Sequence, residues 1–280
     1  MAPEFVYTPA VADLNLRAFL QDLRQHARAF AVLAYVALAL TLCEYLFLST
    51  RMIAWFPEAA ATLAPAGVFG SFERAALMGY PERGPWWGVL VPQAWWTGGT
   101  LLLWVVVPFT ACRFAGYSFA DLGLGARGFV SKLWLYGLLF LVMVPGVLWA
   151  ATQEGFLQTY PFLKPQHCAR WCWLVLACYW GIYGLQFVAV EFFFRGFMVF
   201  VLEKDFGPGA IAVMVVPYCM IHYHKPLPEA LGAIVAGVVL GWLALRTRSI
   251  WGGVLLHVAV ALSMDALALW RAAAFPQSWF

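Results

Sequence analysis

The segment "VEFFFRGFMVF", Val190–Phe200, places one carboxylate and one guanidinium inside an otherwise apolar run. Glu191 and Arg195 are four residues apart, so on a helix they share one face and can form an ion pair. A charge held within a membrane helix is rare, and by default it indicates function. This pair is therefore the first candidate site.

Two histidines follow in later apolar segments. "YCMIHYHKP" places His222 at the end of one segment, and "LLHVAVALSMD" places His257 about two turns into the last one. A carboxylate with a neighbouring imidazole can take a proton from water and pass it to a leaving amine, while a second imidazole stabilises an oxyanion. These residues predict peptide-bond hydrolysis, with Glu191 and His222 activating water, His257 stabilising the oxyanion and Arg195 orienting Glu191.

Other chemistries use some of the same residues. One Glu and two His can bind zinc with water in an open position, but the chain has no HExxH motif and the ligands are scattered, so we expect no cofactor and do not favour zinc. Cys219 lies three residues before His222, yet no third group is evident to orient a base for a thiol nucleophile. We interpret the six cysteines as small hydrophobic residues, although Cys168 and Cys172 can pair in an oxidising loop. Glu44 is the reserve candidate for a further carboxylate.

The composition indicates which elements must position these side chains. The chain has 280 residues, of which 64% are hydrophobic and 11% charged, against roughly a quarter charged in ordinary globular proteins. We expect an integral membrane protein with an all-α fold, a polytopic transmembrane helical bundle. The net charge of +3 is scattered, with no basic block of five residues, which excludes a nucleic-acid partner. The expected surroundings are the lipid bilayer.

Seven apolar windows approach the roughly 20 residues that a membrane helix needs. They lie at about Ala29–Leu48, Trp95–Cys112, Leu133–Ala151, Trp171–Val190, Pro208–Ile221, Ala230–Leu245 and Ile250–Met264. Ala54–Gly70 is a further short or interfacial segment, so we predict about seven to eight membrane helices.

We predict one bundle, because no polar linker or internal repeat divides the chain. Residues 1–28 form an N-terminal amphipathic segment on the membrane surface, or a solvated helix packed on the bundle. Residues 29–165 supply the N-terminal membrane helices, and residues 166–280 supply the core that carries the candidate site.

The distribution of Lys and Arg slightly favours a cytoplasmic N-terminus. With seven spans, nine basic residues then face the cytoplasm and seven face the other side. We expect a multi-pass protein of a bacterial inner (cytoplasmic) membrane.

Simple geometry links two of the candidate residues. If the chain reverses at residues 205–207, Glu191 and His222 each lie roughly 21–23 Å from the turn at 1.5 Å per residue, and so at similar depth. His257 is nearer its own preceding turn, so its convergence with them requires helix tilt or unequal loops.

The chain resembles a known family at these residues. "EFFFRGF", the step from Tyr218 to His222 and "RTRSIWGGVLLH" are similar to the CPBP family of intramembrane endopeptidases, related to the CAAX prenyl protease and to bacteriocin self-immunity proteins. The resemblance covers about Gln186–Asp265. It implies a helical membrane bundle, a glutamic-type mechanism without an obligate metal, and cleavage of peptides near or within the bilayer.

The resemblance carries over residue by residue. Glu191 matches the second Glu of the family's EExxxR motif and Arg195 its Arg, His222 matches the His of FxxxH, and His257 matches the His of the last motif. Two positions depart from the pattern. Val190 stands where the family has its first Glu, the expected base, and Ala261 where it has an Asn.

Three functions follow as hypotheses. The first is an intramembrane protease that cleaves a membrane-anchored peptide or protein C-terminal tail, with Glu191 taking over as base. The second is a non-catalytic protein of the same fold, an immunity or chaperone-like peptide-binding factor, which the two departures favour. The third is a proton-coupled carrier, although the chain lacks the repeated halves that many carriers have.

Overall fold

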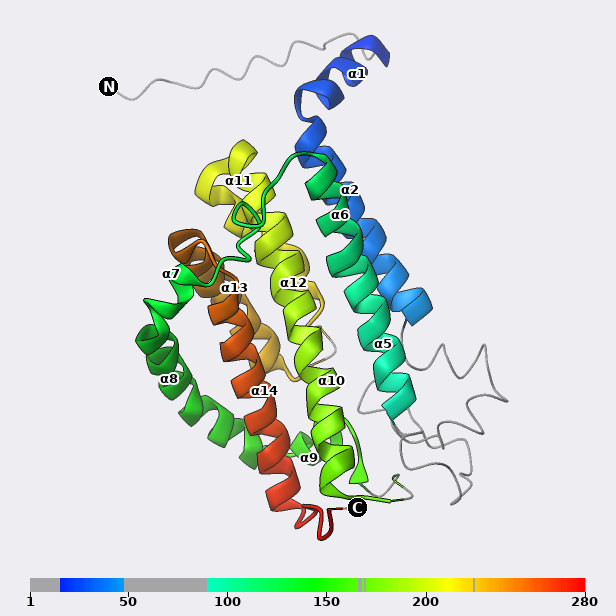
Figure 1. Ribbon diagram of the computed structural model, residues 1–280, viewed down its shortest axis with the longest axis vertical. Helices are drawn as coiled ribbons and strands as arrows, with labels where there is room; N and C mark the ends of the chain where they lie inside the picture. The colour runs from blue at the N-terminus through cyan, green and yellow to red at the C-terminus, as the bar shows by residue number, and fades with distance from the viewer. Residues whose placement is uncertain (1–15, 48–89, 166–167, 169, 224, 280) are drawn as a thin grey trace.

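The computed structural model describes residues 16–47, 90–165, 168, 170–223 and 225–279 (Figure 1). This part of the chain is helical and contains no strand, which confirms the predicted all-α class. The possible extra segment Ala54–Gly70 lies outside the described residues, as does the first half of the predicted N-terminal segment.

Six segments are long and apolar enough to cross a membrane. Five are single crossings, which contain α2 (Ala27–Leu42) with η1 (Cys43–Phe47), α5 (Val91–Leu101) with η4 (Leu102–Val106) and α6 (Val107–Phe114), α8 (Leu133–Thr152), α13 (Leu227–Thr247) and α14 (Trp251–Arg271). The sixth, Trp173–Met220, is a hairpin. Its first leg is α10 (Trp173–Glu191), η6 (Phe192–Val199) and α11 (Phe200–Phe206), and its second leg, after the turn η7 (Gly207–Gly209), is α12 (Ala210–Met220). The seven predicted windows correspond to these seven legs.

Short helices complete the described part: α1 (Leu16–Gln25), α7 (Arg127–Val130) and α9 (Phe156–Thr159). On α1, Phe19 and Leu20 are exposed, as a helix on a membrane surface requires. The placement of this segment on the membrane remains a prediction.

The helix α12 is shorter than the window that predicted it. Its 11 residues extend about 16 Å at 1.5 Å per residue, roughly half of the 30 Å hydrocarbon core. The glycine turn Gly207–Gly209 occupies the start of the predicted window, and the chain reverses again after Met220. The connection between α12 and α13 therefore lies partway along the length of the bundle rather than at its far end.

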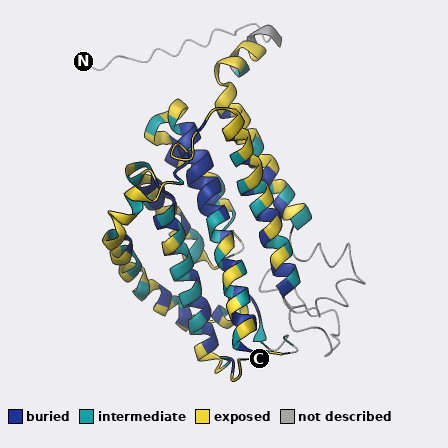
Figure 2. Ribbon diagram, in the orientation of Figure 1, coloured by how far each residue is buried: buried dark blue, intermediate teal, exposed yellow. Residues whose placement is uncertain are grey.

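Burial follows the pattern of a protein surrounded by lipid. Trp134, Leu141 and Val142 on α8 are more than 60% exposed, because lipid tails accept apolar side chains as readily as a protein core does. Figure 2 shows these exposed faces on the outer helices and a continuous buried run through the centre. That run is η6, in which every residue is buried, including Arg195.

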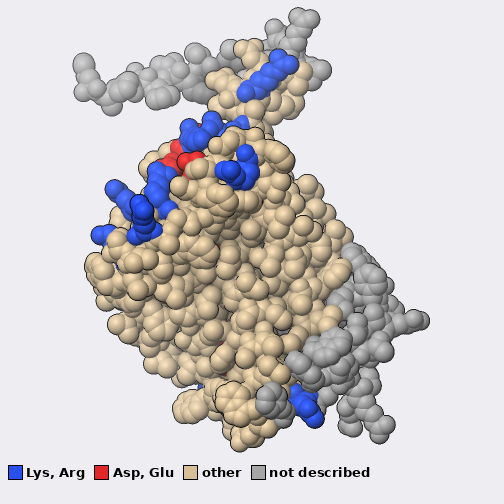
Figure 3. All heavy atoms as spheres, in the orientation of Figure 1, with Lys and Arg blue, Asp and Glu red and all other residues tan. Residues whose placement is uncertain are grey.

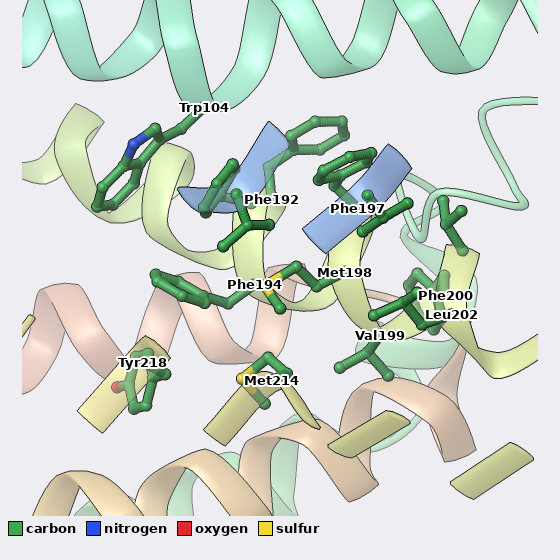
Figure 4. Packing of buried hydrophobic residues seen from close by; sticks show 14 of the residues in the cluster. Trp104, Phe192, Phe194, Phe197, Met198, Val199, Phe200, Leu202, Met214 and Tyr218 are labelled. Carbon is green, nitrogen blue, oxygen red and sulfur yellow. The ribbon is translucent and has the colours of Figure 1, made fainter. Parts of the chain in front are cut away.

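Aromatic rings fix the position of η6 (Figure 4). Trp104 of η4 stacks on Phe193 with ring centroids 5.0 Å apart and meets Phe194 edge-on at 5.6 Å, and Phe194 in turn meets Tyr218 of α12 at 5.2 Å. Both η4 and η6 are π-helical, a geometry that occurs frequently at functional sites. The widened turns of η6 begin directly after Glu191, so they set where Arg195 points relative to that carboxylate.

Basic side chains gather at one end of the molecule (Figure 3). The residues at the α1, α6, α7, α11 and α13 ends of the bundle are Arg24, Arg28, Arg113, Arg127, Lys132, Lys204, Arg246 and Arg248. Two of them form ion pairs there, Arg28 with Asp205 at 3.0 Å and Arg248 with Glu203. This sorting is the one expected for a cytoplasmic end, and the orientation itself remains a prediction.

Candidate active site

The first predicted pair forms at the junction of α10 and η6. Arg195 Nη1 lies 3.0 Å from Glu191 Oε1, and the two side chains are 0% and 1% exposed. Removing two charges from water is costly unless they are paired, so the four-residue spacing that brings them together is a condition for their burial. Glu191 and Arg195 thus occupy the centre of the bundle.

His257 of α14 makes the shortest contact with this pair. Its Nδ1 lies 2.7 Å from Glu191 Oε1. Gly253, one turn earlier, permits this approach, because a methyl group at that position would overlap the Glu191 carboxylate. Neither this contact nor that of Arg195 is an aligned hydrogen bond within the described structure, so the attraction is mainly electrostatic. The convergence of His257, which simple depth arithmetic left open, is a direct contact.

Tyr218 of α12 connects the remaining groups, and the sequence had indicated it only as part of a motif. Its hydroxyl lies 2.9 Å from His257 Nε2, and the guanidinium of Arg195 lies over its ring at 4.2 Å. Its backbone carbonyl accepts a hydrogen bond from His222 Nδ1 at 2.8 Å. We refer to Glu191, Arg195, Tyr218 and His257 as the Glu191 cluster.

His222 lies just beyond α12, at the edge of the Glu191 cluster rather than inside it. Because a carbonyl only accepts hydrogen bonds, its Nδ1 carries a proton, which leaves Nε2 as the acceptor in the neutral ring. Burial holds the pKa of the His222 imidazole below its usual value, and the Tyr218 carbonyl and the Glu229 carboxylate oppose this shift. The ring is therefore a neutral base near pH 7. Contrary to the direct pairing that we expected, His222 reaches Glu191 only through Tyr218 and His257.

The two departures from the family pattern lie in apolar surroundings. Val190 is 8% exposed and belongs to the hydrophobic cluster around η6, and Ala261 is 7% exposed and belongs to the cluster between α10 and α14. Glu44, the reserve carboxylate, is exposed on η1. The carboxylate that the family pattern places before Glu191 is therefore supplied neither by position 190 of α10 nor by Glu44 of η1.

The other predicted chemistries find little support in the geometry. All six cysteines are free, including Cys168 and Cys172, and Cys219 contacts the Ala230 carbonyl at 3.8 Å. In the part of the chain that the structure describes, no three His, Cys, Asp or Glu side chains gather as metal ligands. That the protein needs no cofactor remains a prediction.

Sequence reasoning missed two groups of polar residues within the bundle. Asp265 of α14 is 0% exposed and faces Tyr179 and Trp180 of α10. Tyr160, Lys225 and Glu229 form a second cluster beside His222, which we call the Tyr160 cluster. The signal for Asp265 was available, because it is a carboxylate inside a predicted span. The Tyr160 cluster joins segments that are distant in sequence, so no local sequence pattern predicts it.

Comparison with known proteins then identifies the family. Residues 132–263 match the family model described as type II CAAX prenyl endopeptidase Rce1-like, whereas neither the curated proteins nor the solved structures contain a match. This segment is similar to the CAAX protease family. The match extends from the start of α8 into α14 and includes Glu191, Arg195, His222 and His257. It begins well before Gln186, where our predicted resemblance started, and therefore adds α8. The six apolar segments indicate a multi-pass membrane protein, and residues 132–263 are similar to CAAX-type peptidases.

Proposed function

We propose that this protein is an intramembrane endopeptidase that cleaves the tails of membrane-associated peptides or proteins by a glutamate-dependent mechanism. One observation carries the proposal: the Glu191 carboxylate, fully buried in an apolar bundle, contacts both Arg195 and His257. Packing alone does not explain this arrangement, because each buried charge costs several kcal/mol before its partners offset it. The family of residues 132–263 supports the same chemistry.

The geometry favours a division of roles that differs from our sequence prediction. Both partners of Glu191 contact the same oxygen, Oε1, and Gly253 packs against the other oxygen, so little room remains for a water molecule. In our proposal, Glu191 orients His257 and balances the charge of Arg195. His222, with its free Nε2, takes the proton from water.

The hydroxyl of Tyr218 and the imidazole of His257 act on the other side of the reaction. They lie 2.9 Å apart, and the guanidinium of Arg195 packs over the ring of the same Tyr218. Donors fixed in a site without bulk water stabilise a developing oxyanion far better than they do in solution. We assign the oxyanion of the tetrahedral intermediate to this pair, with Arg195 supplying positive potential.

The experiment compares new protein termini in membranes from cells that carry the wild-type chain, Glu191→Gln or Cys219→Ser at equal folded levels. Glu191→Gln retains the volume of the side chain but removes its charge, and we expect its termini to disappear. Cys219→Ser is the matched control one turn from His222, and we expect it to retain them. Loss of termini in Cys219→Ser alone favours a thiol nucleophile instead.

A non-catalytic peptide-binding protein is the second candidate, because Val190 and Ala261 replace the polar residues of the family pattern with buried apolar side chains. Identical termini in wild type and Glu191→Gln, in cells where the protein is expressed and folded, support this candidate over the protease.

A further inference from the structure

The Tyr160 cluster has no role in the proposed mechanism. The Tyr160 hydroxyl lies 3.0 Å and 2.9 Å from the two carboxylate oxygens of Glu229, to which it donates. Lys225 Nζ donates to the Tyr160 oxygen at 3.1 Å and lies 3.4 Å from Glu229 Oε1. The Lys225 ammonium also packs over the Phe162 ring at 4.1 Å. Three polar side chains from two segments of the chain are thus held in one place.

This cluster lies directly beside His222. The end of α12 contacts the start of α13, where Cys219 Sγ lies 3.8 Å from the Ala230 carbonyl. A turn joins the two helices, closed by a hydrogen bond from the Lys225 N–H to the His222 carbonyl at 2.9 Å. Glu229, in the first turn of α13, lies within electrostatic range of the His222 imidazole.

The surroundings of the turn suit a reaction that consumes water. Because α12 covers only about half of the hydrocarbon core, the turn is irregular backbone at membrane depth. Such backbone is tolerated only where it is buried in protein or lines a water-filled cavity. The Glu229 side chain is 28% exposed, whereas that of Glu191 is 1% exposed. Glu229 is therefore the more accessible of these two carboxylates.

We propose that Glu229 is the carboxylate partner of His222, a positioning residue that stabilises the imidazolium formed when His222 takes a proton from water. This inference rests on the proposed peptidase function. It assigns to α13 the carboxylate that the family pattern places at position 190, where this chain has a buried valine.

The step balances as a hydrolysis. His222 Nε2 accepts one proton of the water as the water oxygen bonds to the scissile carbonyl carbon. When the C–N bond breaks, that proton passes to the leaving nitrogen, and the second proton of the water stays with the new carboxyl group until it ionises. Glu229 stays ionised throughout, and His222 returns to its neutral form.

The test is the titration of His222, followed by NMR of histidine-labelled protein in lipid nanodiscs. The charged or titratable groups that act on this ring are Glu229, Lys225 and His257. Glu229→Gln removes the one negative charge among them, so the titration midpoint of His222 should move to lower pH. Cleavage at neutral pH should fall about tenfold, the loss expected when one ionic contact no longer stabilises the transition state.

Two variants separate an electrostatic role from a structural one. Tyr160→Phe removes the hydroxyl that holds Glu229 but retains the charge, so the His222 midpoint should stay close to the wild-type value. Glu203→Gln neutralises a glutamate of a surface ion pair on α11 and should also leave it unchanged. A midpoint that is equal in Glu229→Gln and wild type overturns the proposal. Equal shifts in Glu229→Gln and Tyr160→Phe overturn it as well, because they indicate a structural latch.

The readouts also separate this proposal from the function on which it rests. If wild type cleaves but the His222 midpoint is the same in Glu229→Gln and wild type, the role of Glu229 is overturned and the peptidase function stands. If the His222 midpoint of Glu229→Gln is lower than that of wild type but wild type generates no new termini, the pairing of Glu229 with His222 is supported and the peptidase function is overturned.

Discussion

Gly253→Ala places one methyl group against the Glu191 carboxylate. The added carbon overlaps the carboxylate in the present packing, and the carboxylate cannot withdraw, because Arg195 and His257 hold it and its side chain is 1% exposed. Overpacking of this kind costs about 1–3 kcal/mol, and the cost approaches about 3–5 kcal/mol if the ion pair separates. We expect the variant to lose both stability and cleavage.

Gly184→Ala in α10 is the matched control. In the described part of the chain, no atom other than its chain neighbours and the backbone of its own helix lies within 4 Å of the position that its new methyl group occupies. The same substitution there should stabilise the helix by up to about 1 kcal/mol, because alanine has the higher helix propensity. Reversible unfolding in mixed micelles should therefore separate the two variants by about 1–4 kcal/mol. If Gly253→Ala is as stable and as active as Gly184→Ala, the packing of Glu191 against α14 is wrong.

Four further outcomes follow from the site. Tyr218→Phe, which loses the hydroxyl at His257 but retains the ring beneath Arg195, should reduce cleavage about tenfold or more with a change in stability of only about 1 kcal/mol, measured by turnover and unfolding; equal turnover would remove the hydroxyl from the mechanism. Arg195→Met leaves Glu191 unpaired in the core and should lower the free energy of unfolding by about 3–5 kcal/mol; a neutral result would mean that the pair is not buried. Burial lowers the pKa of His222, so cleavage should continue at pH values below the usual titration range of histidine and should fall as the pH drops through that lowered pKa. A loss of cleavage that begins above pH 7 would exclude a neutral His222 as base. Cleavage by protein stripped with a strong chelator should continue undiminished, and loss that is restored by zinc would favour the metal mechanism.

The sequence predicted the helices more accurately than their contacts. Each of the seven apolar windows overlaps a helical leg, because lipid imposes helical structure on any long apolar segment. The length of α12 was overestimated, since hydrophobicity alone does not distinguish a half-crossing from a full one. The pairing of Glu191 with Arg195 followed from local spacing and is present.

Contacts between helices required information that local patterns do not hold. His257 reaches Glu191 because Gly253 allows α14 to approach α10, and depth arithmetic contains no term for helix tilt or for the size of a neighbouring residue. Tyr218 contacts His257 of α14 through its hydroxyl and His222 at the end of its own helix through its carbonyl, which its place in an apolar segment does not suggest. Glu229 lies near His222 in our proposal because the chain reverses between α12 and α13, at the turn closed by the Lys225 N–H and the His222 carbonyl.

The most direct test is cleavage of a substrate tail, identified from the terminus comparison, by the purified protein in liposomes. Wild type and His222→Ala should be compared, because the His222 ring hydrogen-bonds only to a carbonyl of its own turn and its loss should leave the buried Glu191 cluster folded. The mechanism predicts that wild type cleaves the tail at one bond and that folded His222→Ala binds the tail but does not cleave it. Cleavage by His222→Ala at the wild-type rate, or binding without cleavage by wild type, would contradict it.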